Sequence, residues 1–255
     1  MPTATEPGRF SVMLSIIVAA AFGLLVGVIW ALSGLWGGWI VGFILFTLLF
    51  VGSIFLISRF IGKRVEPPVL QAQKQLQAGQ TQLALKTLEG LLPLARWQIL
   101  LRSQIESQIG TIYYGMGDEA KALEHLKYAN PRIPEAFLLL GAMHYRAGRH
   151  DDSRKVMEAA IRLNRKNALL ANAYAYFLAE KGDRSAAIEQ LQKYLKADDS
   201  DKPTADNLSR LQNGKKMSMK SFGLPWYSLK VEKLPGSMRA AGVPHPGIHG
   251  RRRFR

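Results

Sequence analysis

The chain has 255 residues, enough for one or two domains, and 34 Lys and Arg against 19 Asp and Glu give it a net charge of +15. It contains no cysteine, which excludes disulfide bonds, cysteine-ligated zinc or iron–sulfur centres and thiol catalysis. Residues 1–65 carry four basic and one acidic residue, residues 66–213 carry 20 and 17, and residues 214–255 carry ten and one. An electrostatic partner is therefore expected mainly at the C-terminal end.

Residues 10–58 contain no charged residue and no histidine, a composition typical of membrane-spanning helices. Two apolar runs, about 10–32 and 39–57, are each long enough to cross a hydrocarbon core about 30 Å thick. The short, uncharged, glycine-rich link over 33–38 predicts an antiparallel two-helix transmembrane hairpin. A cleavable signal peptide is the rejected alternative, because the first run is too long and a second follows at once.

Basic residues flank the predicted hairpin only at its outer ends, at Arg9 and between Arg59 and Arg64. This distribution predicts an integral membrane protein with both termini in the cytoplasm. No ionisable side chain lies inside either span, so we interpret the hairpin as an anchor and not as a transport path. Small residues at four-residue spacing predict close helix packing, either within the hairpin or against another membrane subunit. They are Ala19, Gly23, Gly27, Gly38 and Gly42.

Helical patterning begins after Glu66, where Pro67 and Pro68 suit the first turn of a helix. Four later segments share a turn glycine, a small residue five positions on and a large apolar residue four positions beyond that. The turn glycines are Gly79, Gly117, Gly148 and Gly182. The clearest segment, around Gly117, has a second glycine seven residues earlier, at Gly110. The pattern strongly resembles the tetratricopeptide repeat family, over about residues 66–197.

The resemblance implies pairs of helices stacked into a solenoid whose concave face, formed mainly by the first helix of each pair, binds peptides or protein segments. The predicted fold is therefore all-α, in three parts. A transmembrane hairpin covers 1–64, and a solenoid of about four repeats plus a terminal helix covers 65–213. A basic, Pro- and Gly-rich and largely disordered tail covers 214–255.

Three tyrosines, Tyr114, Tyr145 and Tyr176, are 31 residues apart and occupy equivalent positions that, by the resemblance, face the groove. Such an aromatic ladder can hold an extended segment through ring contacts and hydrogen bonds. The alternative is that some of these rings belong to the core. The predicted groove residues are Thr111, Tyr114, Tyr145, Arg146, Asn172 and Tyr176. The family's carboxylate clamp needs Lys and Asn where this chain has Ser107 and Thr111, so binding of chaperone tails is not expected.

The cations of the tail are predicted to face an anionic partner, and three alternatives stay open: anionic lipid, RNA or a ribosome, and protein. These residues are Lys215, Lys216, Lys220, Arg251, Arg252, Arg253 and Arg255. Within the tail, the apolar aromatic stretch from Phe222 to Tyr227 is expected to dock on the solenoid, on the membrane or on a partner.

No phosphate-binding loop, dinucleotide fingerprint, nucleophile elbow or HExxH motif occurs. His245 and His249 have no nearby carboxylates, so we expect no metal, no cofactor, no small-molecule substrate and no catalysis. We predict a membrane-anchored adaptor or scaffold that binds protein segments in its groove and organises a membrane-associated complex. Two alternatives are a protein that tethers RNA or ribosomes through its tail and a non-catalytic accessory subunit of a larger membrane complex. The module order also looks like bacterial HemY-type proteins, which implies a bacterial inner membrane.

Overall fold

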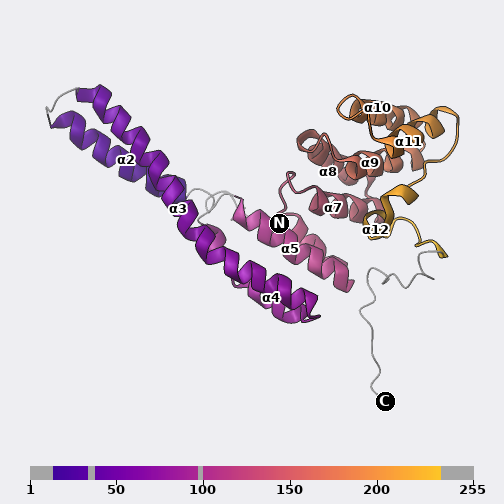
Figure 1. The fold of residues 1–255 in the computed structure, drawn as a ribbon, viewed down its shortest axis with the longest axis horizontal. Coiled ribbons are helices and arrows are strands. Elements are labelled where there is room, and N and C mark those ends of the chain that lie inside the picture. The colour runs from indigo at the N-terminus through magenta and orange to yellow at the C-terminus, as the bar shows by residue number, and fades with distance from the viewer. Residues whose placement is uncertain (1–13, 34–37, 97–99, 237–255) are drawn as a thin grey trace, which may run out of the picture. The chain divides into compact units, whose positions relative to one another are not determined.

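A computed structural model of the chain describes residues 14–33, 38–96 and 100–236 (Figure 1). These residues form α-helices, short 3-10 helices and turns, which confirms the all-α prediction. The chain divides into two compact units, residues 1–105 and 106–255, and each is taken by itself below.

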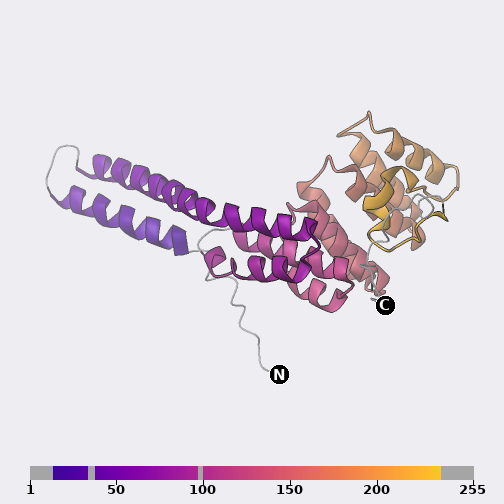
Figure 2. The ribbon, with the colours of Figure 1, turned by 60° about the horizontal axis from the view of Figure 1, so that its bottom comes forward.

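The first unit begins with two apolar helices, α2 (Leu14–Leu32) and α3 (Gly38–Gln77), which lie side by side (Figure 2). They meet through the predicted small residues: a Cβ added at Gly27 would lie 2.9 Å from the carbonyl oxygen of Gly42. Gly23 likewise faces Phe46, and Ala19 is fully buried. The small residues therefore serve the α2–α3 contact, because only glycine and alanine let the two backbones come so close.

One helix among the described residues, over 39–77, is long and apolar enough to cross a membrane. Helix α2 counts only as a shorter apolar helix, over 16–32, because the start of the predicted first span lies outside the described residues. The link between the helices is also mostly outside them. The two-span hairpin therefore stays a prediction.

Helix α3 continues without a break from the apolar stretch to Gln77, with Pro67 and Pro68 inside it. The prediction that these prolines open a new helix is therefore wrong. Proline fixes a helical φ and removes only its own backbone donor, so the ladder loses two bonds while the flanking turns persist. After Gly79, helix α4 (Thr81–Glu89) folds back on the end of α3, and a 3-10 helix, η1 (Leu94–Arg96), follows.

The repeats of the second unit are antiparallel helix pairs followed by one further helix. The pairs are α5 (Leu101–Met116) with α6 (Glu119–Leu126), α7 (Pro134–Arg146) with α8 (His150–Leu163), and α9 (Ala168–Glu180) with α10 (Arg184–Leu195). Helix α11 (Lys202–Gln212) packs on the last pair. The first five residues of α5 belong to the first unit.

The glycine pattern of the sequence is confirmed in the turns that join the helices of each pair. Gly117, Gly148 and Gly182 have φ of 87°, 74° and 91°, a left-handed conformation that glycine adopts without strain. The small residues after these turns are buried, as are the large apolar residues four positions further on. They are Ala122, Ser153, Ala187, Leu126, Met157 and Leu191. Each second helix therefore closes tightly on its first.

The prediction of a disordered tail is wrong for its first half, and the expectation that Phe222 to Tyr227 docks on the solenoid is confirmed, because Trp226 and Tyr227 lie in the core of the repeats. Beyond Gly214 the chain forms a 3-10 helix, η2 (Lys220–Phe222), and a short helix, α12 (Gly223–Tyr227). Its apolar side chains are buried in the same core as the repeats, namely Met217, Met219, Trp226, Tyr227, Leu229 and Leu234. The stretch lacks helical periodicity because its apolar residues fit the surface of other helices and not a face of their own. Residues 237–255 lie outside the described part of the chain.

Candidate functional site

The first helices α5, α7 and α9 bring the three predicted groove tyrosines into one unit, on what we call the first-helix face. Residues 215–234, called the docked segment below, cover it (Figure 1; Figure 2). The face that the family resemblance assigns to partner proteins is thus occupied by the chain's own residues.

Trp226 is the apolar anchor of the docked segment. Its ring is fully buried, meets the Tyr176 ring edge-on at 4.9 Å between centroids and lies 6.4 Å from the Phe177 ring. Burying an indole removes a large apolar surface from water, and the indole nitrogen then requires an acceptor. Glu232 provides it: one carboxylate oxygen accepts from Trp226 Nε1 at 2.7 Å.

The other oxygen of the Glu232 carboxylate accepts from the Tyr176 hydroxyl at 3.1 Å. Burial, and secondly the Glu232 charge, raise the pKa of Tyr176 well above its usual value of 10. The hydroxyl therefore stays protonated and donates at any physiological pH. One carboxylate thus fastens the segment's tryptophan to α9.

Tyr114 holds the middle of the docked segment. Only 4% of this residue is exposed, and its hydroxyl donates to the backbone carbonyl of Ser228 at 3.0 Å. Burial raises the pKa of Tyr114 to about 12, so the hydroxyl remains a donor. The acceptor of this hydrogen bond is a main-chain carbonyl and not a side chain. The bond therefore does not depend on which residue stands at that position of the segment.

Tyr145, the middle rung of the predicted ladder, is half-buried and stacks on Phe177 at 4.4 Å between ring centroids. Burial, followed by the charge of Glu180, raises the pKa of Tyr145. The alternative that some of the three rings belong to the core therefore holds for the buried Tyr114, while Tyr145 and Tyr176 are half-buried and their contact with a partner stays a prediction. The rings contact Phe177, from the middle of α9, and Trp226, from the docked segment. The 31-residue spacing of the tyrosines could not predict these two neighbours.

Arg146, the fourth predicted residue, sits at an electrostatically crowded point. Its Nη1 donates to the Glu119 carboxylate at 2.9 Å, and Lys230 Nζ from the docked segment lies 3.8 Å from the same oxygen. Nε and Nη2 of Arg146 are buried and have no hydrogen-bond partner within the described residues. Two cations thus share one carboxylate while two nitrogens of the guanidinium have no acceptor among the described residues.

The remaining two predicted groove residues lie differently. Thr111 donates its hydroxyl to the backbone of Ser107 and lines a hollow of about 300 Å³ beside Tyr114 and Ser228. Asn172 is fully buried and bonded to Thr204 on α11, so its prediction as a groove contact is wrong. Helix α9 has almost no other polar side chains, so its sequence has no polar face. The sequence therefore does not show whether Asn172 is buried or exposed.

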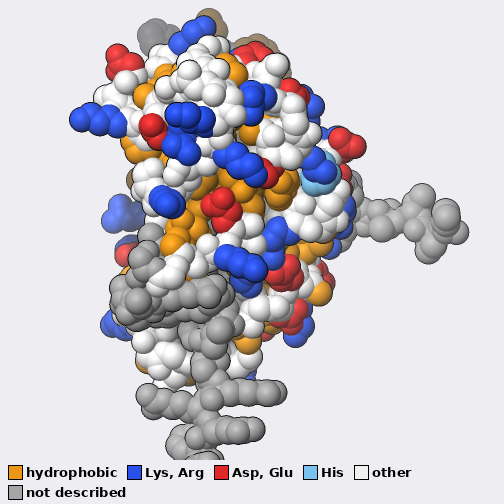
Figure 3. All heavy atoms as spheres, turned by 90° about the vertical axis from the view of Figure 1, so that its right-hand side faces the viewer, with side chains coloured by type: hydrophobic (Ala, Val, Ile, Leu, Met, Phe, Trp, Pro, Cys, Tyr) orange, Lys and Arg blue, Asp and Glu red, His pale blue; other side chains and the backbone are white. Residues whose placement is uncertain are grey.

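Of the predicted tail cations, Lys215, Lys216 and Lys220 are exposed at the start of the docked segment, and the four arginines lie outside the described residues. Lys216 Nζ approaches Glu180 at 3.9 Å, a weak surface pair. Figure 3 shows a face on which Lys and Arg side chains are interspersed with Asp and Glu and with hydrophobic patches. Mixed charge of this kind is ordinary for a solvated surface.

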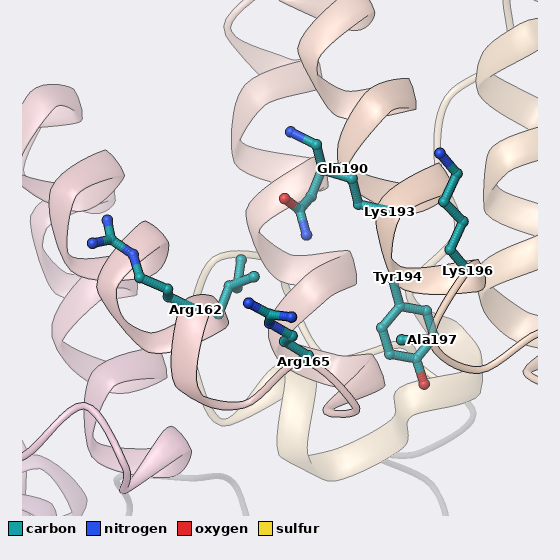
Figure 4. A pocket seen from close by; sticks show the side chains of 8 residues that line it. Arg162, Arg165, Gln190, Lys193, Tyr194, Lys196 and Ala197 are labelled. Atoms are coloured by element: carbon teal, nitrogen blue, oxygen red, sulfur yellow. The ribbon is translucent and has the colours of Figure 1, made fainter.

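A second hollow, of about 470 Å³, lies between the second helices α8 and α10 (Figure 4). Four exposed cations line it: Arg162, Arg165, Lys193 and Lys196. Lys193 is paired with Glu189 at 2.7 Å on its own helix. Sequence reasoning missed these four residues. They come from two separate helices, and along each helix the basic residues are mixed with acidic ones, so no basic run marks the hollow. Within the described part of the chain, no group of three or more His, Asp and Glu side chains is placed to hold a metal ion.

Comparison with known proteins identifies the helix pair α7–α8. Residues 134–167, which contain α7 and α8, match the tetratricopeptide repeat family, so the predicted repeat type is confirmed. Such repeats bind other proteins and are typically not catalytic. No curated protein matches the chain.

The solved structures similar to this chain include two with MamA in their titles. One, titled "Crystal structure of MamA", shares 17% identity at a TM-score of 0.43 and covers 57% of this chain and 86% of that one. The other, titled "Crystal structure of MamA protein", shares 16% identity at a TM-score of 0.43 and covers 70% and 91%.

Proposed function

We propose that this protein is a scaffold whose tetratricopeptide repeats bind partner proteins and whose N-terminal helices anchor those partners to a membrane. The observation that carries the proposal is the repeat array itself, with its buried small residues and left-handed turn glycines around the matched pair α7–α8. Stacked helix pairs of this kind present long surfaces suited to protein segments.

The anchoring half of the proposal rests on the apolar surface of α3 and α2. Ile40 and Phe43 expose 76% and 69% of their surface, and many neighbours do the same. A soluble protein rarely leaves so large a continuous apolar surface uncovered, whereas lipid covers it at no cost. We propose two spans, with both termini and the repeats in the cytoplasm, and, from the module order, a bacterial inner membrane.

Two other functions are less well supported. Docking of the hairpin onto a larger membrane complex through its small residues is disfavoured, because Gly23, Gly27 and Gly42 already pack within the α2–α3 pair. RNA tethering depends on Arg251 to Arg255, which lie outside the described residues, and Lys215, Lys216 and Lys220 alone form a small basic patch.

Crosslinking in intact membranes, followed by affinity purification and mass spectrometry, tests the proposal. The comparison is between the natural chain and a variant in which residues 1–64 are replaced by an unrelated two-span anchor. We expect the same protein partners from both, because the repeats select them. Partners lost with the natural hairpin would establish an accessory subunit instead, and recovery of RNA without protein partners would establish tethering.

A further inference from the structure

The hollow between α8 and α10 is called the basic hollow below, because its described lining residues include four cations and no acidic side chain. Figure 4 shows Gln190 and Arg165 pointing toward the space between the two helices. Arg162 and Lys196 stand at its margins (Figure 4). Both helices end here, and each helix C-terminus carries about half a negative charge. The two ends together offset about one of the four cations, so roughly three positive charges remain uncompensated.

The acidic side chain of α8 that could neutralise the basic hollow is engaged by other groups. One oxygen of Glu158 accepts from the Tyr174 hydroxyl at 2.8 Å and from Arg154 Nε at 3.1 Å. Arg162, one turn further along α8, therefore attracts Glu158 only as a more distant charge. Within the described part of the chain, three of the four cations of the hollow form no salt bridge: Arg162, Arg165 and Lys196.

The basic hollow continues into an adjoining hollow of about 320 Å³ along the same two helices. The two hollows share the side chains of Ile161, Arg162, Gln190 and Lys193. The adjoining hollow adds the buried Leu178 and the half-buried Ala186, and only there do acidic side chains line the wall. Together they form one groove with an apolar floor and a cationic end. Such a groove suits an extended chain that carries acidic residues at one end.

We propose that the basic hollow binds an acidic segment of a partner protein, whose carboxylates are held by Arg162, Arg165 and Lys196 and whose apolar side chains contact the floor of the groove. This inference rests on the proposed scaffold function and gives the scaffold a binding surface separate from the first-helix face. A guanidinium holds a carboxylate by two parallel hydrogen bonds. The Gln190 amide offers a donor and an acceptor for the main chain of the segment.

RNA and lipid suit the basic hollow less well than a protein segment. Single-stranded RNA binds where exposed aromatic rings accept stacked bases. Tyr194, the aromatic ring in the lining, is buried and donates its hydroxyl to Asp198 at 3.3 Å. A membrane surface is broad and attracts projecting cations. Gln190 and Ile161 instead lie half-buried between the helices, where a single chain reaches them and a bilayer does not.

The test uses the full-length protein in mild detergent and a fluorescent peptide of about six alternating glutamate and leucine residues, which spans about 20 Å when extended. A second peptide has glutamine in place of every glutamate. Fluorescence anisotropy measures binding to the natural chain and to two variants that each lose two positive charges. Arg162→Gln/Arg165→Gln changes the basic hollow, and Lys155→Gln/Lys181→Gln changes cations outside it. All four positions are exposed, so both variants should unfold at the temperature of the natural chain.

We expect saturable one-to-one binding of the glutamate peptide to the natural chain. The glutamine peptide should bind at least about tenfold more weakly, and Arg162→Gln/Arg165→Gln should weaken the glutamate peptide by at least the same factor, since each lost charge-assisted hydrogen bond costs about tenfold. Lys155→Gln/Lys181→Gln should change binding by less than about twofold, because salt screens distant exposed charges.

Three results would overturn the inference. Equal weakening by the two variants would reduce the binding to general charge attraction, and equal binding of the two peptides would remove the need for carboxylates. An oligouridylate, or an anionic lipid added to the detergent, that displaces the glutamate peptide at a lower concentration than unlabelled peptide would assign the site to RNA or lipid. Failure of the scaffold function is a separate result: the peptide would bind the basic hollow while membrane crosslinking found no protein partner.

Discussion

Asn172, Asn207 and Thr204 form a buried hydrogen-bond network that joins α9, α11 and the docked segment. Asn172 Nδ2 donates to Thr204 Oγ1 at 2.6 Å, and Asn207 Nδ2 donates to Asn172 Oδ1 at 3.0 Å. Asn207 Oδ1 then accepts from the backbone N–H of Ser218 at 2.7 Å. Because each member satisfies the next, removing one leaves buried polar atoms without partners.

Replacement of Asn172 by Ala should lower the free energy of unfolding by about 2–3 kcal/mol, since Thr204 and Asn207 lose partners in a dry site. Urea unfolding of the full chain in mild detergent, followed by circular dichroism, measures it. Gln192→Ala on the exposed surface of α10 is the matched control and should change stability by less than about 0.5 kcal/mol. Equal changes in stability for Asn172→Ala and Gln192→Ala would show that the hydrogen bonds of Asn172 do not stabilise the fold.

His144 gives a pH dependence with a definite sign. Burial, and secondly the charge of Arg149, lower the pKa of His144 below its usual 6.5, although Asp152 opposes them. The unfolded state therefore takes up a proton at a higher pH than the folded state, so stability is lost as the pH falls below about 6.5. His144→Gln should flatten this loss between pH 7.5 and 5.5 in thermal unfolding. Parallel pH curves for both proteins would refute the assignment.

Two glycines of α5 respond oppositely to the same substitution. A Cβ at Gly110 would lie 2.7 Å from Leu126 Cγ, whereas one at Gly115 would meet nothing within 4 Å. We predict that Gly110→Ala costs about 1–3 kcal/mol by overpacking and that Gly115→Ala gains about 0.5–1 kcal/mol from helix propensity. Chemical denaturation of the two variants measures this difference, and each variant serves as the control for the other. A Gly110→Ala variant that is more stable than the natural chain would show that α6 does not pack as closely on α5 as described.

At the scale of elements, the docked segment binds as a unit through its apolar side chains and two tyrosine hydroxyls. Trp226→Ala removes the only fully buried indole among the described residues, and we expect a loss of about 3–5 kcal/mol. Hydrogen exchange should rise sharply over residues 215–234 while the amides of α8 and α10 stay protected. Lys233→Ala, at an exposed position of the same segment, should change neither region. Uniform loss of protection through the repeats would mean that the segment and the helices unfold together.

The elements that the sequence predicts correctly depend on local rules. The repeat helices follow from apolar spacing and from turn glycines such as Gly117, whose left-handed backbone selects the residue type. The errors concern contacts between distant segments. The burial of Asn172, the covering of Tyr114 and the order of residues 215–234 each need a partner surface more than 30 residues away, which no local pattern encodes. The prediction that Pro67 and Pro68 begin a helix is wrong for another reason. A helix with enough turns on both sides of a proline tolerates the missing backbone donor.

At the scale of the whole molecule, the chain joins apolar N-terminal helices to tetratricopeptide repeats that already hold a segment of their own. We propose that these apolar helices anchor the repeats to a membrane and that the repeats bind other proteins there. The docked segment contacts Tyr114 and Tyr176 of the first-helix face, so a partner bound there would meet residues 215–234 as well as the repeats.

The most direct measurement is photo-crosslinking in intact membranes from a reactive amino acid placed at Thr111 on α5 or at Leu224 on the docked segment. Both side chains are exposed, Thr111 lines the hollow beside Tyr114, and Leu163 on the second helix α8 is the reference position. A protein scaffold predicts discrete protein adducts from Thr111 and Leu224 that differ from those at Leu163. Adducts to lipid or RNA alone at Thr111 and Leu224 would contradict protein binding by this face of the repeats.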